Sequence, residues 1–101
     1  MPATADRIQL RHPDRTKKMP RIDQGVYAVV RRTALATLPK RAPGMTWTEL
    51  RDTVADKLGR ARGWDRTLNA WWYTTAVKLD LEARGEIERI PRSSPQRLIR
   101  K

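Results

Sequence analysis

The 101-residue sequence contains no cysteine, no phenylalanine and a single histidine, His12. The absence of cysteine excludes disulfides, thiolate zinc sites and cysteine nucleophiles. A lone histidine in a polar segment favours neither a metal site nor a Ser-His-Asp triad. No apolar run approaches the ~18 residues of a transmembrane helix, residues 1–21 lack the apolar region of a secretory signal, and no glycine-rich phosphate-binding loop occurs. We therefore expect a cytoplasmic protein that is not an enzyme, with no metal, cofactor, small-molecule substrate or membrane partner.

Positive charge is abundant: Lys and Arg number 22 against 11 Asp and Glu, a net charge of +11. Such an excess favours a polyanionic partner. The net charge is +4 over residues 1–22, +3 over 23–44, +1 over 45–66, zero over 67–85 and +3 over 86–101. The charge therefore gathers at the two ends of the chain and in loops, and the most apolar stretch is neutral.

Residues 1–22 are polar, basic and interrupted by Pro2, Pro13 and Pro20. Arg7–Leu10 alternates as a short strand does. We interpret the segment as a basic N-terminal arm, partly disordered when free, that precedes a single domain over residues 23–101. Its cations either follow a nucleic-acid backbone or belong to a solvated tail; they are Arg7, Arg11, Arg15, Lys17, Lys18 and Arg21.

Two helices are predicted in the first half of the domain. Asp23 is a suitable N-cap for a helix that reaches Leu38, with apolar residues four apart on one face. Thr46 and Glu49 have the spacing of a capping box, and Gly59 stands where a left-handed C-terminal cap is expected.

A third helix is predicted from Arg66 to Arg84, with Asp65 as its N-cap and Gly85 ending it. Its apolar residues fall on two sides, which indicates burial by neighbours on one side and by a partner or the arm on the other. The adjacent Trp71, Trp72 and Tyr73 cannot all face the core, and Trp71 is our candidate for the exposed ring. A β-hairpin follows, with strands Glu86–Ile90 and Arg97–Arg100.

This order of elements resembles the winged helix-turn-helix fold. The most specific stretch is Leu79–Arg89, in which Leu81, Gly85, Ile87 and Arg89 resemble an L-x-x-x-G-x-I-x-R passage from the third helix into the first wing strand. Residues 95–98 resemble the descending wing strand. The resemblance implies an α+β, mainly helical winged helix-turn-helix domain with a C-terminal β-hairpin wing.

A closer similarity is to a small family of uncharacterised bacterial proteins. It rests on Pro43–Thr46, on Trp71–Trp72 and on Thr75–Ala83. This similarity implies the fold and no activity.

Two features depart from DNA-binding winged helices. The turn between the second and third helices is about seven residues, where three or four are usual. The third helix is net neutral, although a helix that reads bases usually presents Arg, Lys, Asn or Gln. Both departures weaken base readout and leave phosphate binding intact.

We expect a nucleic-acid-binding module for duplex DNA, with a small transcription regulator as the candidate role. The third helix would lie at the major groove, and the wing, the Arg60–Arg66 loop and the N-terminal arm would bind phosphates. A homodimer is a further candidate assembly. The rival hypotheses are a protein-interaction or dimerisation module with an incidental basic surface, and RNA or single-strand binding. The predicted nucleic-acid-binding residues are Arg60, Arg62, Arg66, Asn69, Tyr73, Thr74, Lys78, Arg89, Arg92, Arg97 and Arg100.

Overall fold

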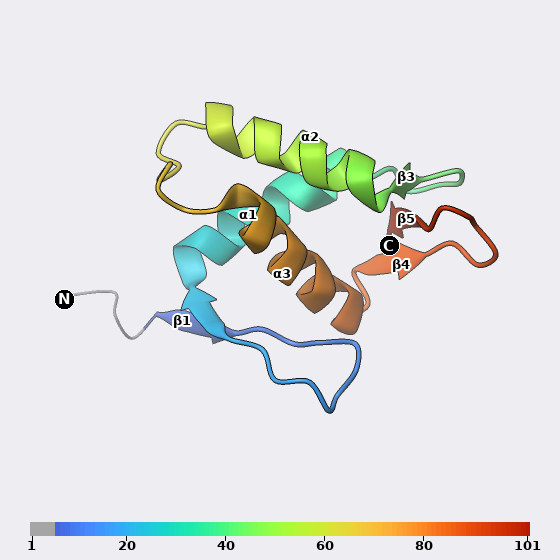
Figure 1. Cartoon of the computed structure of the whole chain (residues 1–101), viewed down its shortest axis with the longest axis horizontal. Helices are drawn as coiled ribbons and strands as arrows, with labels where there is room; N and C mark the ends of the chain where they lie inside the picture. Colours follow the sequence, from blue (N-terminus) through green and yellow to red (C-terminus); the bar gives the residue numbers. More distant parts are fainter. Residues whose placement is uncertain (1–5) are drawn as a thin grey trace.

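The computed structural model describes residues 6–101 and shows an α+β protein in which three helices pack beside small antiparallel sheets (Figure 1). Residues 1–5 of the expected arm, including Pro2, lie outside the described residues. The elements in chain order are β1 (Arg7–Gln9), β2 (Arg21–Asp23), α1 (Gln24–Thr37), β3 (Met45–Thr46), α2 (Trp47–Arg60), α3 (Ala70–Ala83), β4 (Ile87–Arg89) and β5 (Arg97–Arg100).

The N-caps predicted for the first two helices are confirmed, whereas Gly59 is not the C-terminal cap of α2. The Asp23 side chain accepts from the Val26 N–H at the start of α1. Thr46 and Glu49 form the reciprocal capping box of α2, with bonds of 3.2 and 2.9 Å. Each bond satisfies a backbone N–H group that the first helical turn leaves free.

The connection between α2 and α3 is longer than predicted. The helix α2 continues through Gly59 to Arg60, and the left-handed glycine of this connection is Gly63, with φ of 86°. At the other end Asp65 does not cap α3, because its carboxylate accepts from the N–H and hydroxyl of Thr67 in a local turn. Asn69 is the N-cap instead, so α3 begins four residues later than predicted.

The core lies where the three helices meet. Val30 of α1, Leu50 and Leu58 of α2, and Val77 and Leu81 of α3 are fully buried there. The opposite side of α3 is open: the side chains of Trp71 and Trp72 remain exposed. The two-sided apolar pattern of α3 therefore corresponds to one side in the core and one side on the surface. No helix within residues 6–101 is long and apolar enough to cross a membrane.

The C-terminal sheet has the strand order β3-β5-β4, and β3 was not predicted. Its Met45 pairs with Leu98. Gly44, just before β3, has φ of 71°, and a Cβ atom there would lie 2.3 Å from the Leu98 carbonyl oxygen. Only glycine fits this approach of the two backbones. Ile87 of β4 and Leu98 of β5 are buried in the core, on the inner face of the sheet.

The N-terminal segment is folded onto the helices, which differs from the partly disordered arm that we expected. Strands β1 and β2 pair antiparallel, and Leu10 and Ile22 are buried in the same core as the helices. Residues 10–20, here called the N-terminal loop, join the two strands and extend along the C-terminal half of α3 (Figure 1). Apolar burial of the two side chains stabilises the hairpin against the helices.

Candidate nucleic-acid interface

The predicted wing residues are less available than their number suggests. Arg89 forms an ion pair with Glu82 at 2.5 Å, which raises the pKa of its guanidinium. Arg97 is partly buried and donates to the Gly44 carbonyl at 3.4 Å, and Arg100 is also partly buried. Arg92, at the turn between β4 and β5, is exposed with φ of 62°. One of the four is therefore both exposed and without an ion pair in the described residues.

The loop between α2 and α3 holds three of the predicted arginines. Arg60 is paired with Asp56 at 3.4 Å, Arg66 donates to the Gly59 carbonyl at 2.7 Å, and Arg62 is exposed. Trp64 is buried in the core beneath the loop. The loop lies at the opposite end of the molecule's long axis from the β4–β5 turn (Figure 1), so the two sets of predicted residues do not form one cluster.

The side chains of α3 do not support base readout as predicted. Thr74 is 1% exposed and donates its hydroxyl to the Ala70 carbonyl, so it cannot contact a partner. The Lys78 side chain is 11% exposed, pairs with Glu82 at 2.8 Å and lies over the Trp47 ring. Asn69 uses its side-chain oxygen as the N-cap. Tyr73 is partly buried beside Trp64 and Trp72.

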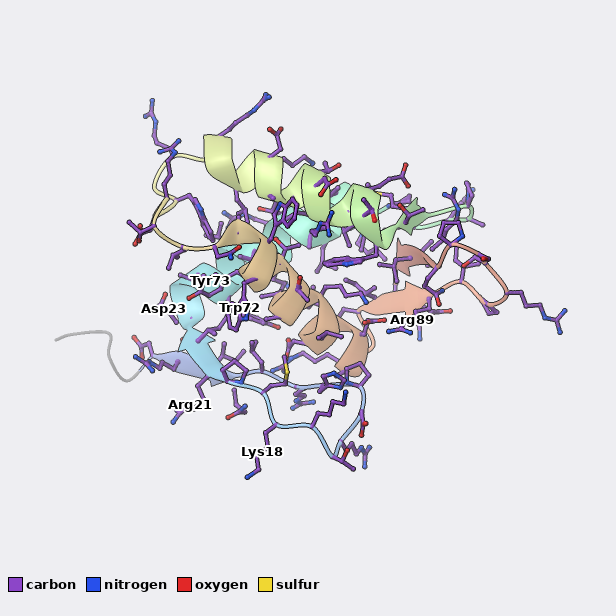
Figure 2. The ribbon with its side chains drawn as sticks, viewed as in Figure 1. Lys18, Arg21, Asp23, Trp72, Tyr73 and Arg89 are labelled. Atoms are coloured by element: carbon purple, nitrogen blue, oxygen red, sulfur yellow. The ribbon has the colours of Figure 1, made fainter. Side chains whose placement is uncertain are left out.

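The N-terminal loop belongs to the arm that we expected on phosphates, but none of its cations was among the predicted binding residues. It borders an open hollow of about 770 Å³ against the C-terminal end of α3. Figure 2 shows Lys18 and Arg21 projecting from this hairpin. Six cations of the hairpin form no ion pair within residues 6–101: Arg7, Arg11, Arg15, Lys17, Lys18 and Arg21.

The acid nearest in sequence to these cations has another role. Asp14 accepts from the N–H and the hydroxyl of Thr16, at 3.0 and 2.7 Å, and these hydrogen bonds lower the pKa of its carboxyl. The carboxylate thereby holds a turn in the loop. His12 accepts from the Asp14 N–H through Nδ1, which orients the ring within the same turn. Sequence reasoning did not detect that the Asp14 carboxylate is engaged by Thr16, which leaves the neighbouring cations without an ion pair.

A buried carboxylate attaches the N-terminal hairpin to α3. Asp80 has no exposed surface and accepts from the Arg11 N–H at 2.8 Å, the Tyr27 hydroxyl at 2.6 Å and Arg84 Nε at 2.8 Å. Burial and the hydrogen bond to Asp80 raise the pKa of Tyr27 to about 12. The donors offset the cost of removing the carboxylate from water.

Two exposed tryptophans lie in the first turn of α3. Trp71 is 53% and Trp72 is 45% exposed, and they are the exposed large apolar side chains of the described chain. The Arg51 guanidinium lies 4.1 Å from the centre of the Trp71 ring. Trp71 was the ring predicted to be exposed, and Trp72 accompanies it. No group of three or more metal-ligating side chains occurs in residues 6–101.

The fold and the charge distribution describe a small basic α+β domain. The chain belongs to the family DUF6958, a family of unknown function, whose model matches residues 7–98. This match includes the N-terminal hairpin as well as the three helices and both outer strands of the C-terminal sheet. No curated protein and no solved structure matches the chain.

Proposed function

We propose that this protein is a non-enzymatic nucleic-acid-binding module of the winged helix-turn-helix type that binds phosphates through its N-terminal hairpin. The observation that carries the proposal is the set of six hairpin cations without an ion pair in the described residues, four of which line an open hollow. Unpaired Lys and Arg side chains on one segment are suited to contact a polyanion's backbone.

The topology supports the winged-helix part of the proposal. The three helices come in the expected order and are followed by the antiparallel pair β4–β5. The short strand β3, between α1 and α2, joins the same sheet next to β5. This unpredicted strand connects the segment before α2 to the β4–β5 hairpin.

The mode of binding in this proposal differs from that of a groove-reading helix. Lys78 of α3 and Arg84, the C-cap residue that follows it, are each paired with a carboxylate of α3. Affinity therefore comes from phosphate contacts, and sequence preference is weak. Because each contact releases a counterion, affinity falls steeply as salt rises.

The test is fluorescence anisotropy of a labelled oligonucleotide over a salt series, with two matched double variants. Lys17→Ser with Lys18→Ser removes two cations from the N-terminal loop. Lys40→Ser with Arg41→Ser removes two exposed adjacent cations from the connection before β3, on the opposite side of the molecule (Figure 1). The net charge of the two variants is the same.

We expect the loop variant to lower the slope of log affinity against log salt by about 2, that is, about one per lost phosphate contact. The Lys40 and Arg41 variant keeps the wild-type slope. Equal losses in the two variants would mean that net charge alone drives binding. A chain that binds no oligonucleotide at low salt is not a nucleic-acid-binding protein.

A second candidate function is protein interaction or dimerisation through α3. The exposed Trp71 and Trp72 favour it, because tryptophan is enriched among the residues that dominate protein interfaces. Sedimentation velocity tests this function. If the protein forms a concentration-dependent dimer and binds no oligonucleotide, the interaction function is supported and the nucleic-acid proposal is wrong.

A further inference from the structure

The exposed side of α3 places two large aromatic rings in water. Trp71 and Trp72 lie next to each other in the first turn of the helix, 53% and 45% exposed. Leaving such rings uncovered forgoes the stabilisation that burial of a large apolar side chain provides. Adjacent exposed rings of this size mark a surface that a partner covers.

Neighbouring side chains contact both rings in the unbound protein. Arg51 of α2 lies over Trp71 at 4.1 Å. Trp72 meets Tyr73 edge-on, with centroids 4.9 Å apart, and Tyr73 meets the buried Trp64 edge-on at 6.3 Å. The Asn69 cap fixes the backbone N–H of Trp72. A ring that is already ordered loses little conformational entropy when a flat group stacks on it.

The aromatic pair and the cationic hollow are connected along one helix. The hollow is lined by Ala83 at the end of α3 and by the cations of the N-terminal loop. From Trp72 to Ala83 the helix rises about 16 Å. Exposed Thr75 and partly exposed Leu79 lie on the strip between them. Figure 2 shows Trp72 on the side of α3 that faces the β1–β2 hairpin, from which Arg21 and Lys18 extend.

We infer that Trp71 and Trp72 stack on unpaired bases, and that the nucleic acid this protein binds is single-stranded. The strand's bases contact the rings at the start of α3, and its phosphates continue over the helix to the N-terminal loop. Stacking rings beside a cationic track are the two components of sequence-tolerant single-strand binding. The inference rests on the proposed function and makes it more specific.

The charge of the surface favours a nucleic acid over a protein as the occupant. The Arg51 guanidinium lies over the Trp71 ring. The N-terminal loop contributes Arg11, Arg15, Lys17 and Lys18 to the lining of the hollow. A second copy of this chain would bring the same positive charge to the same place and be repelled. In a duplex the bases are already stacked on each other, so the rings would find no free base face.

The experiment compares single-stranded oligo(dT) with a duplex of random sequence, by anisotropy and by quenching of tryptophan fluorescence. The test variant is Trp71→Leu with Trp72→Leu, which keeps apolar area and removes the π-faces. Trp71→Phe with Trp72→Phe is the matched control, because it keeps rings that stack. Urea unfolding establishes that both variants fold as the wild type does.

We expect the leucine variant to lose about 5- to 150-fold in single-strand affinity per ring, which corresponds to the ~1–3 kcal/mol that base stacking contributes. The phenylalanine variant recovers most of the loss, and the weaker duplex affinity changes less than about twofold. Unchanged single-strand affinity in the leucine variant overturns the inference, while a loss in the Lys17 and Lys18 variant still supports the proposed function. If no oligonucleotide binds, both fail. If the leucine substitutions abolish self-association and leave oligonucleotide binding intact, the surface is a protein interface.

Discussion

The N-terminal hairpin and the C-terminal hairpin are both short antiparallel pairs rich in arginine, yet their cations have different neighbours. In the C-terminal hairpin Arg89 is paired with Glu82, Lys101 lies near Glu88, and Arg97 and Arg100 are partly buried. In the N-terminal hairpin no cation is paired within the described residues. The comparison teaches that the number of cations in a segment does not measure the charge that it offers to a partner.

The two hairpins also differ in what attaches them to the helices. The N-terminal hairpin depends on two buried apolar side chains and on the hydrogen bonds of one buried carboxylate, Asp80. The C-terminal hairpin is joined to α2 by the pairing of β3 with β5, for which the backbone at Gly44 comes close to Leu98. A single substitution can therefore test each attachment.

The largest expected effect is at the attachment of the N-terminal hairpin. Asp80→Ala should cost about 3–5 kcal/mol of unfolding free energy, because Arg84 and the Tyr27 hydroxyl lose their buried acceptor. Urea unfolding measures the loss, and limited trypsin digestion at Arg15 and Lys17 reports release of the loop. Asp56→Ala, which breaks an exposed pair with Arg60, should stay within about 0.5 kcal/mol. Equal losses in the two variants would contradict the anchoring role of Asp80.

The next effect is alkaline destabilisation through Tyr27. Its pKa is raised to about 12 by burial and by the hydrogen bond to Asp80, against about 10 in the unfolded chain. A folded-state pKa above the unfolded value stabilises the protein fully below pH 10, and this contribution of about 2–3 kcal/mol is lost as the pH rises to 12. Urea midpoints between pH 9 and 12 measure it. The Tyr27→Phe variant should lack this part of the pH dependence, and an unaltered profile would refute the assignment.

A smaller effect is expected at the attachment of the C-terminal hairpin. Gly44→Ala should destabilise by about 2 kcal/mol, because the new Cβ collides with the Leu98 carbonyl and the φ of 71° is unfavourable for alanine. Gly63→Ala is the control, since its φ of 86° is equally strained and nothing lies within 4 Å. The difference between the two urea midpoints isolates the collision. Indistinguishable midpoints would show that the strands tolerate a wider spacing.

The smallest effect is on binding by the C-terminal hairpin. Arg92→Ala with Arg97→Ala should weaken oligonucleotide affinity about twofold and lower the salt slope by no more than about 1, because only Arg92 is exposed and unpaired. The same anisotropy assay measures it beside the Lys17 and Lys18 variant. A larger loss from the arginine pair than from the lysine pair would reverse the comparison between the hairpins and return the site to the wing.

Local interactions made parts of the fold predictable. The Asp23 cap and the Thr46–Glu49 capping box involve residues three apart, so the sequence carries the whole interaction. The start of α3 was mispredicted because Asp65 and Asn69 both had suitable side chains. Thr67 decided the competition by supplying two donors to Asp65. A two-residue strand such as β3 has no periodicity to detect, and its pairing with β5 spans about half the chain.

The candidate site was less predictable than the helices. Thr74 and Lys78 were chosen as polar residues on the third helix, and the structure turns Thr74 into the interior and pairs Lys78 with Glu82. Trp71 was correctly chosen as an exposed ring. The exposure of Trp72 depends on where the N-terminal hairpin lies along α3, which no local pattern encodes.

The sequence by itself determined the surplus of positive charge, the lack of thiol chemistry, three helices with their apolar faces, and the N-caps of the first two helices. These features depend on composition or on residues within one helical turn. Three ion pairs join residues four apart in the chain, namely Asp56–Arg60, Lys78–Glu82 and Asp80–Arg84. The tertiary structure decided the pairs between different elements and therefore which of the other cations have no partner in the described residues. Asp80, Glu82 and Glu86 pair with arginines or lysines on α1, α3 and β4, whereas the carboxylate of the N-terminal loop, Asp14, bonds to Thr16. Charge availability is a property of neighbours in space, and the chain sets those neighbours only by folding.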